Sequence, residues 1–235
     1  MKAILIPVKD PSRAKTRLAE LLSADERQRL AWAMFQDVSR AVTRSTSADC
    51  IVLVSSFAPA INHARKLAWD VLVEEAQVSE SASVDWASRI LRERGVDLVM
   101  RLPADVPLIE TEDIDALLSI EMGARAAVMV PSLEGTGTNA IIRRPPDLFP
   151  SRFGPNSLAL HKEEAARVGV ECLIVSNERI ALDIDEPQDL QLLAERVSGS
   201  ETHSLIAELG LTAAPAREPG ITQRRKGAEL RRGKS

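Results

Sequence analysis

Short apolar runs alternate with amphipathic segments along most of the chain, and this alternation constrains the fold more than any other feature. The apolar runs have the length and composition of β-strands buried on both faces. The segments between them carry apolar residues at helical spacing and begin with capping residues or prolines. Such alternation predicts an α/β domain in which helices cover both faces of a mostly parallel, Rossmann-like sheet.

The expected elements follow one another without a Pro/Gly-rich linker before residue 200, so a single domain is predicted for residues 1–200. A capping box formed by Ser23 and Glu26 marks the start of the first helix. Ser81 or Ser83 is expected to cap the third helix, and Thr111 the fourth. The predicted strands are 3–8, 50–54, 71–73, 97–102, 127–130, 140–142, 171–175 and 180–184, and the predicted helices are 24–44, 59–67, 81–94, 111–123, 155–169 and 187–197.

The C-terminal part of the chain differs in composition from the rest. Residues 201–211 are compatible with a short helix, whereas residues 212–235 are rich in Pro, Gly and basic residues and predict a disordered basic tail. From Arg217 onward the chain has seven basic and two acidic residues, a net charge of +5; the whole chain carries −4, which leaves −9 for the remainder. The tail either contacts RNA or another anionic surface, or is a solvated segment without function, which we favour.

Composition excludes several functional classes. Aromatic residues make up only 3% of the chain, which argues against a base-stacking single-strand binder, and the net negative charge also argues against nucleic-acid binding by the folded domain. Two cysteines, Cys50 and Cys172, cannot form a disulfide framework and are expected to be inert core thiols. The apolar runs are far shorter than the ~20 residues that span a bilayer, and no signal-peptide pattern is present. We therefore expect a cytoplasmic protein without a membrane partner.

Ligands bind at the carboxyl ends of the strands in such sheets, so the residues that follow each strand are the candidates for the site. Four cations, Lys9, Arg13, Lys15 and Arg17, follow the first strand within nine residues. Lysine point charges and flat arginine donors suit a polyphosphate. The spacing matches neither a Walker A loop nor G-x-G-x-x-G, and a solvated basic loop is the alternative.

Carboxylates follow two other strands. Asp105 stands between two prolines after the fourth strand, and Asp183 and Asp185 are two apart on an expected strand, so they face the same way. Neighbouring carboxylates repel each other unless a cation lies between them, and their oxygen atoms are ligands that Mg²⁺ prefers. The alternatives are a turn-closing role for Asp105, a helix cap for Asp185 and simple exposure of Asp183.

Two further segments predict a pocket for a small phosphorylated acid. The Gly-rich turn at residues 134–139 has backbone N–H groups that can bind an anion. The segment from Arg152 to Ser157 ends at a helix N-terminus, which also favours anions. Either segment alone could be only a turn or a cap. The histidines are expected at the surface or in caps, although His161 lies one turn past Ser157 and can reach the pocket. No Ser-His-Asp arrangement is visible, so the predicted chemistry uses a metal and cations without a covalent nucleophile.

Taken in this order, these segments resemble the guanylyltransferases of coenzyme F(420) biosynthesis, a branch of the nucleotide-diphospho-sugar transferase (GT-A-like) fold. The likeness covers about residues 1–197. The motifs that carry it are Pro7-Val-Lys9, Ala14-Lys15-Thr-Arg17-Leu18, Leu102-Pro-Ala-Asp105-Val-Pro-Leu108, Gly137-Thr138-Asn139-Ala140, Arg152-Phe-Gly154-Pro-Asn-Ser157 and Leu182-Asp183-Ile-Asp185-Glu-Pro187. Two features depart from the pattern: Pro11-Ser12-Arg13 replaces a Gly-rich loop, and Asn156 precedes Ser157 where members often carry Gly.

The resemblance implies an enzyme that joins GTP to a small phosphorylated three-carbon acid and releases diphosphate. Phosphoenolpyruvate, 2-phospho-L-lactate and 3-phosphoglycerate are the acids that this family uses. The resemblance also implies a role for each matching residue. Catalysis is assigned to Lys9, Lys15, Arg17 and Asp105, contact with the acid to Thr138, Gly154 and Ser157, and Mg²⁺ binding to Asp105, Asp183 and Asp185.

Two alternatives and one question stay open at this point. The chain could be another nucleotidyltransferase of the same fold, acting on a sugar phosphate or a molybdopterin. It could also be a non-catalytic GTP-binding regulator, which would not need three carboxylates at the strand ends. The sequence does not determine the oligomeric state, and a homodimer is one possibility.

Removal of the basic tail is predicted to leave the enzyme intact. A chain that ends at Leu211 should keep its turnover and its melting temperature, because residues 212–235 contain few apolar residues to bury. Thermal unfolding and activity of the truncated and full chains test this. A loss of several degrees would show that the tail packs on the body.

Overall fold

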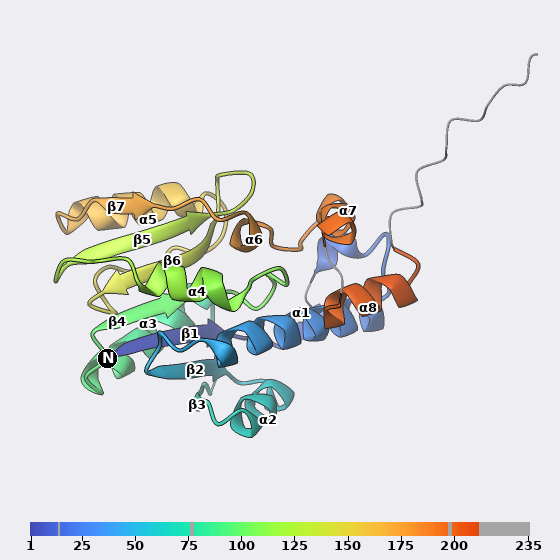
Figure 1. The fold of residues 1–235 in the computed structure, drawn as a ribbon, viewed down its shortest axis with the longest axis horizontal. Coiled ribbons are helices and arrows are strands. Elements are labelled where there is room, and N and C mark those ends of the chain that lie inside the picture. Colours follow the sequence, from blue (N-terminus) through green and yellow to red (C-terminus); the bar gives the residue numbers. More distant parts are fainter. Residues whose placement is uncertain (14, 76–77, 197–198, 212–235) are drawn as a thin grey trace, which may run out of the picture.

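A twisted seven-stranded sheet forms the centre of the molecule (Figure 1). The structure is a computed structural model and describes residues 1–13, 15–75, 78–196 and 199–211. In this part of the chain the strands lie in the order β3-β2-β1-β4-β6-β5-β7. The pairs β1–β2, β1–β4, β2–β3 and β5–β7 are parallel, whereas β6 runs antiparallel to both β4 and β5. The predicted α/β class with a mostly parallel sheet is confirmed.

Strands and helices follow one another nearly as the sequence predicts. The strands are β1 (Lys2–Pro7), β2 (Cys50–Ser55), β3 (Asp70–Val73), β4 (Leu98–Arg101), β5 (Ala126–Pro131), β6 (Thr138–Arg144) and β7 (Cys172–Ile174). The α-helices are α1 (Ala24–Arg44), α2 (Ala58–Lys66), α3 (Glu80–Glu93), α4 (Thr111–Leu118), α5 (Ser157–Arg167), α6 (Glu178–Ala181), α7 (Pro187–Arg196) and α8 (Glu201–Glu208). Two short 3₁₀ turns, η1 (Pro11–Arg13) and η2 (Thr16–Leu18), follow β1.

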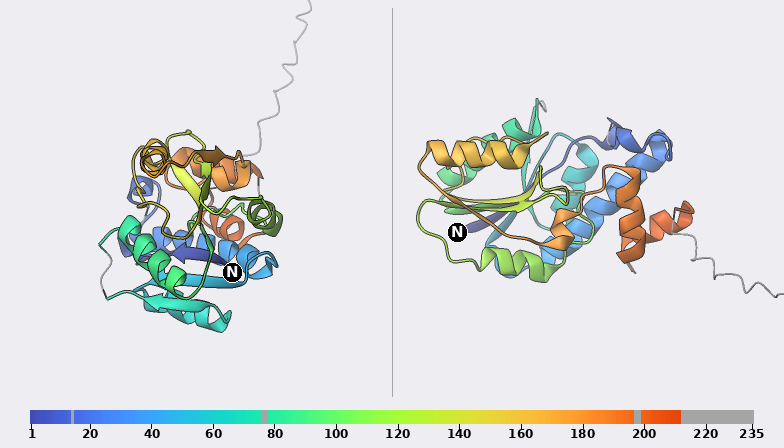
Figure 2. Two further views of the ribbon diagram at one scale, coloured as in Figure 1. Left: turned by 90° about the vertical axis from the view of Figure 1, so that its left-hand side faces the viewer. Right: turned by 90° about the horizontal axis from the view of Figure 1, so that it is seen from above.

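Helices cover both faces of the sheet, as the continuous burial of the central strands requires. On one face, Ile4 and Ile6 of β1 pack in a cluster with residues of α1, α2 and α4. On the other face, Ala3 and Leu5 pack with α3, and Met129 of β5 packs with α5. Figure 2 shows α4 and α5 on opposite sides of the sheet.

A separate apolar cluster lies beyond the edge at which the parallel strands end. It contains Leu30 and Met34 from the first half of α1, with Leu190 of α7 and Ile206 of α8. The second half of α1 packs on the sheet. A helix of 21 residues is about 30 Å long, so α1 spans both clusters (Figure 1). It thereby fixes α7 and α8 beside the edge where ligands bind in such folds.

The predicted strand at residues 180–184 is wrong. The short helix α6 occupies its beginning, because the side chain of Asn177 accepts hydrogen bonds from the N–H groups of Arg179 and Ile180 and caps it. Residues 182–186 then run without regular structure. Ile180, Leu182 and Ile184 are buried, so their alternation reflects packing rather than a strand.

The capping box of Ser23 and Glu26 is confirmed. Three other predictions about helix ends differ from the structure. Ser79 caps α3 in place of Ser81 or Ser83, and Glu110 rather than Thr111 precedes the first turn of α4 in a capping box. That helix ends at Leu118, five residues before Gly123.

The remaining predictions concern the C-terminal segment, the two cysteines and the absence of a membrane-spanning helix. Helix α8 lies in the segment that is compatible with a short helix, and residues 212–235 lie outside the described part of the chain. Cys50 and Cys172 are free and only partly buried. Within the described residues, no helix has the length and apolar character needed to cross a bilayer.

A buried carboxylate attaches α8 to α1. Asp37, whose side chain is only 3% exposed, accepts hydrogen bonds from the N–H groups of Glu201 and Thr202 and from the Thr202 hydroxyl. These groups belong to the first turn of α8, where free N–H groups and the helix dipole favour a negative charge.

Replacement of this carboxylate should destabilise the protein. Asp37→Ala leaves buried donors of α8 unpaired, and we expect the free energy of unfolding to fall by about 2–3 kcal/mol. Chemical denaturation of both chains measures the difference. Glu195→Gln, on the exposed face of α7, is the control and should change it by less than about 0.5 kcal/mol. Equal effects of the two substitutions would contradict the role of Asp37.

Candidate active site

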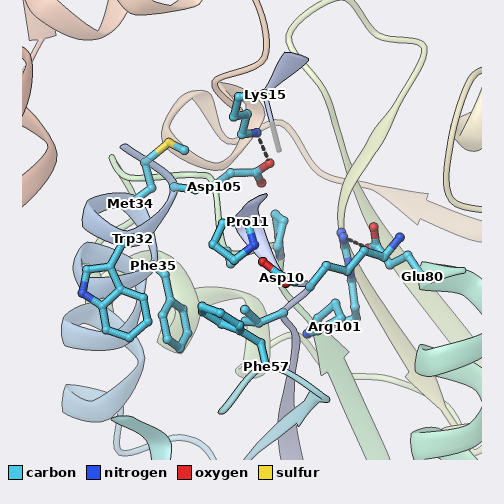
Figure 3. Close-up of a pocket in the computed structure, with 16 residues that line it drawn as sticks. Asp10, Pro11, Lys15, Trp32, Met34, Phe35, Phe57, Glu80, Arg101 and Asp105 are labelled. Carbon is cyan, nitrogen blue, oxygen red and sulfur yellow. Dashed lines mark hydrogen bonds and ion pairs between the residues drawn. The ribbon is translucent and has the colours of Figure 1, made fainter. Parts of the chain in front are cut away.

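Two adjoining cavities open at the edge where the parallel strands end. The larger has a volume of about 540 Å³ and lies between the starts of β6 and α5 and the segment before α7. The smaller, of about 180 Å³, lies under the segment that follows β1 (Figure 3). Glu80, Arg101, Pro103 and Asp105 line both cavities and form their common wall. The predicted residues divide between them: Lys9 and Lys15 line the smaller, Asp105 lines both, and Arg17, Thr138, Gly154, Ser157, Asp183 and Asp185 line the larger.

The ammonium group of Lys15 joins two of the predicted metal ligands. Its Nζ lies 2.5 Å from Oδ2 of Asp105 and 2.8 Å from Oδ1 of Asp185, and Figure 3 shows the contact with Asp105. Lys15 has left-handed backbone angles at the start of η2, and its side chain is only 7% exposed. Residues from three distant parts of the sequence therefore meet at one positive charge.

This contact dominates the local electrostatics. Burial works to lower the pKa of Lys15, but the charges of Asp105 and Asp185 outweigh it and raise that pKa. Burial works to raise the pKa of Asp105, but the Lys15 ammonium, with a smaller effect from Arg101, holds it below its usual value. The two charged forms therefore stabilise each other at neutral pH.

Asp183 stands next to this pair without a cation of its own. Burial, followed by repulsion from Asp105, raises the pKa of Asp183 to about 6. Its Oδ1 accepts a hydrogen bond of 3.0 Å from Nδ2 of Asn139. The same Nδ2 also donates to the carbonyl groups of Ile180 and Ala181 at 2.9 Å. Asn139 thus holds both the end of α6 and the carboxylate that follows it.

The donor set of these three residues fits Mg²⁺. The ion prefers a few carboxylate oxygens, and two of the three carboxylates already converge on the cationic Nζ of Lys15. Within the described residues, however, no group of three or more His, Cys, Asp or Glu side chains is arranged to hold a metal. The three carboxylates are therefore not a preformed cage, and their role as Mg²⁺ ligands stays a prediction.

The antiparallel direction of β6 brings its first residues, rather than its last, to the same edge. Thr138 pairs with Pro131 of β5, whereas Ala140 pairs with Val130, so Asn139 is an extra residue in a β-bulge. Ala140 packs on the face of α1 and α4. Strict alternation would turn Thr138 to that face too, but the bulge turns it toward α5. There its N–H donates to the Ser157 hydroxyl oxygen at 2.8 Å.

The start of α5 supplies the other two predicted acid contacts. Gly154 has φ of +123°, a backbone conformation that side chains disfavour, and its carbonyl accepts from the Ser157 N–H at 3.2 Å. Asn156 precedes the helix in the left-handed conformation and gives no side-chain cap. Ser157 is buried and begins the helix, with its hydroxyl beside Thr138.

Two expectations about anion binding are not met. The N–H of Gly137 is not free for an anion, because it donates to the Ser132 hydroxyl at 2.8 Å. A Cβ at Gly137 would lie 2.8 Å from the same oxygen, so the close approach requires glycine. Arg152 does not line the larger cavity; its guanidinium pairs with Glu164 on α5.

The predicted cations take different positions. Lys9 is exposed and lines the smaller cavity. The apolar wall of that cavity includes Trp32, Phe35 and Phe57 (Figure 3). Arg17 is exposed and pairs with Glu186 at 3.0 Å. The side chain of Arg13 lies outside the described set.

Some residues that shape the site have no recognisable pattern in the sequence. Arg101 of β4 is buried, donates to the Asn139 carbonyl at 2.9 Å, pairs with Glu80 and stacks on the ring of Phe153. The expectation that His161 lies at the surface or in a cap is wrong, since it is fully buried and contacts Thr138. Only its position one turn after Ser157 pointed to the pocket.

Comparison with known proteins shows to which protein family the chain belongs. The family described as "Guanylyl transferase CofC like" matches residues 1–226. The chain belongs to this family. A phosphoenolpyruvate guanylyltransferase of Rubrobacter xylanophilus is 34% identical over 80% of this chain and 91% of its own length. A 2-phospho-L-lactate guanylyltransferase of Methanothermobacter thermautotrophicus is 30% identical over 91% of this chain and 93% of its own.

Solved structures show that the fold is shared with other nucleotide-dependent transferases. A Desulfovibrio desulfuricans protein described as a nucleotide-diphospho-sugar transferase has a TM-score of 0.71 at 22% identity, over 88% of this chain and 94% of its own. A cytidylyltransferase from Leptospira borgpetersenii has a TM-score of 0.55 at 16% identity, over 89% of this chain and 93% of its own. The family and its guanylyltransferase relatives show that the CofC-like chain is a nucleotidyltransferase, which argues against a non-catalytic regulator.

Removal of the Lys15 charge should make stability depend on pH in a new way. In the wild-type chain the lowered pKa of Asp105 adds stability above its unfolded value of ~3.9, and this is lost as the pH falls through the folded pKa. In Lys15→Met, burial acts on Asp105 without the cation, so its pKa rises above the unfolded value. The variant then gains stability as the pH falls.

Melting temperatures at about pH 7.5 and about pH 5 test this expectation. The melting temperature of Lys15→Met should lie further below that of the wild type at the higher pH. Lys9→Met removes an exposed lysine from the same segment and should show the same small difference at both pH values. A deficit of Lys15→Met that does not change with pH would refute the coupling.

Proposed function

We propose that this CofC-like chain transfers the guanylyl group of GTP to the phosphate of a small phosphorylated three-carbon acid, with release of diphosphate. The observation that carries the proposal is the junction of the two cavities. There the Lys15 ammonium and two carboxylates stand beside a pocket in which Thr138 and Ser157 present hydroxyl groups. Cations suit the triphosphate, and hydroxyl groups suit the acid.

The names of the relatives support the choice of acid. They act on phosphoenolpyruvate, on 2-phospho-L-lactate and, in a Colwellia psychrerythraea relative that is 29% identical, on 3-phospho-D-glycerate. These acids share a phosphate and a carboxylate on three carbons. The proposed acceptor is phosphoenolpyruvate or 2-phospho-L-lactate, with 3-phosphoglycerate as the third candidate, and the proposed pathway is coenzyme F(420) biosynthesis.

The reaction needs no general base. A phosphate oxygen of the acid attacks the α-phosphorus of GTP and forms a new P–O bond. The bond between the α-phosphorus and the oxygen that bridges to the β-phosphate breaks, and its electron pair leaves on that oxygen as diphosphate departs. The second pKa of a phosphate monoester is ~6, so the nucleophile is already largely ionised at pH 7. The protein has to hold the two phosphates in line and neutralise the charge that collects on the leaving diphosphate.

The chain offers residues for both tasks. Lys9, Lys15 and Arg17, which line the two cavities, would contact the triphosphate, and Asp105, Asp183 and Asp185 would hold Mg²⁺. Bound there, Mg²⁺ would supply positive charge next to the α-phosphate and the leaving group. Lys15 already neutralises two of these carboxylates, so a triphosphate would draw its ammonium away from them.

The decisive experiment measures diphosphate release with each of four nucleoside triphosphates and each of the three acids, with Mg²⁺ present. GTP with one of the acids should give diphosphate and an equal amount of the guanylylated acid, identified by mass spectrometry. Transfer to a sugar phosphate or a molybdopterin, with no transfer to any of the acids, would refute the proposal.

Neutral amides in place of the carboxylates should slow the reaction while preserving the fold. Asp105→Asn and Asp183→Asn are isosteric, but an amide oxygen is a poor Mg²⁺ ligand. Each should lower kcat at least about tenfold, or about 1.4 kcal/mol in the barrier, with partial recovery at high Mg²⁺.

The matched control is Glu134→Gln, a carboxylate that lines the same cavity and forms no ion pair with a described residue. It should stay within about twofold of wild type. Activity near wild type in both Asn variants, with the same Mg²⁺ dependence, would exclude the carboxylates as the metal site.

A further inference from the structure

His161 is a buried residue of α5 that faces the start of β6, behind Thr138, which lines the larger cavity. Its ring is fully inaccessible to solvent. On one side, Nε2 lies 2.8 Å from the backbone nitrogen of Arg152; on the other, Nδ1 lies 3.1 Å from Oγ1 of Thr138. The edge of the ring packs against Phe153, with 4.9 Å between ring centroids.

These contacts determine which ring nitrogen carries the proton. A backbone N–H group can only donate, so Nε2 must accept the hydrogen bond from Arg152 through its lone pair. Burial, followed by the positive charges of Arg143, Arg101 and Arg152, lowers the pKa of His161 to about 3, so the ring is neutral at physiological pH. A neutral ring that accepts at Nε2 is protonated at Nδ1.

The hydrogen bond to Thr138 therefore runs from Nδ1–H to the hydroxyl oxygen. That oxygen accepts from the histidine, and its own hydrogen remains available to donate. Ser157 is in the same situation, because its hydroxyl oxygen accepts from the Thr138 N–H. Both side chains line the larger cavity. No hydrogen bond donated by either hydroxyl is found among the described residues.

We propose that His161 is a positioning residue that fixes the Thr138 hydroxyl as a hydrogen-bond donor to an oxyanion of the acid substrate. The inference rests on the proposed function and adds to it the chemical character of the pocket. Two hydroxyl groups whose oxygens already accept bonds from the protein can satisfy a ligand atom that only accepts, such as a phosphate or carboxylate oxygen. Because each of these oxygens has used one of its two acceptor lone pairs while its own hydrogen is free, the pair suits a ligand atom that accepts better than one that donates.

Two nearly isosteric substitutions separate this role from simple packing. Both His161→Asn and His161→Leu remove the acceptor for the Arg152 N–H, but only the Asn amide keeps a donor where Nδ1 stood. His161→Leu should raise the KM of the acid about tenfold more than His161→Asn does, while the KM of GTP changes by less than about twofold in either variant. Their melting temperatures should be similar, because both lose the same bond to Arg152.

The same pair in a Thr138→Val background completes the test. Without the hydroxyl, the Leu and Asn variants should have equal KM values for the acid. Equal KM values with Thr138 present, or an undiminished difference without it, would overturn the proposal.

A spectroscopic measurement does not depend on turnover or on the variants. Long-range proton–nitrogen correlation spectra of the full wild-type chain with labelled histidine should show His161 neutral, with a protonated Nδ1 and an unprotonated Nε2. A protonated Nε2, or a doubly protonated ring near neutral pH, would refute the assignment. Should wild-type protein transfer guanylyl groups to none of the acids, the proposed function fails, and this spectrum still decides the state of His161.

Discussion

The contact of one ammonium group with two carboxylates is the interaction on which the site depends. The edge of a parallel sheet brings Asp105, Asp183 and Asp185 together, although like charges at short range oppose folding. Lys15 offsets this repulsion for two of them at 2.5 and 2.8 Å. Lys15 is buried, and its backbone has left-handed angles at the start of η2. The loop after β1, the turn after β4 and the segment before α7 are thereby tied together at a point where no regular structure connects them.

The two halves of the site are built on different physical terms. One wall of the larger cavity carries the neutral hydroxyl groups of Thr138 and Ser157, whose oxygens are already engaged by the protein, on a strand start and a helix start that are packed against each other. The opposite side consists of charged groups, and its lysine and carboxylates satisfy one another. Hydrogen bonds between packed elements hold the first arrangement. An ion pair holds the second, so a charged ligand there has to compete with an interaction that the protein already makes.

Much of this could be predicted from the sequence, because alternation and strand ends are local patterns. The apolar runs predicted the mostly parallel sheet. The position of Asp105 after the fourth of them predicted that it lies at the edge where the parallel strands end. The prediction of a strand at residues 180–184 failed because the capping side chain of Asn177 outweighs apolar alternation there. Contacts between distant residues leave no local pattern. The hydrogen bond from Asn139 to Asp183 joins residues 44 positions apart. Arg152 likewise pairs with Glu164, a contact that its neighbours in the sequence do not indicate.

The bulge at Asn139 affects how a site of this kind can change over evolution. It is one extra residue between two registers of the β5–β6 pair, and it turns Thr138 and Asn139 each toward a different helix. Deletion of Asn139 would restore even pairing and leave Thr138 beside Ala140 but on the opposite face, toward α5, so the Thr138 hydroxyl would keep its place. Asp183 and the end of α6 would instead lose the amide that holds them, so the length of this strand controls the support of Asp183 separately from the hydroxyl beside Ser157.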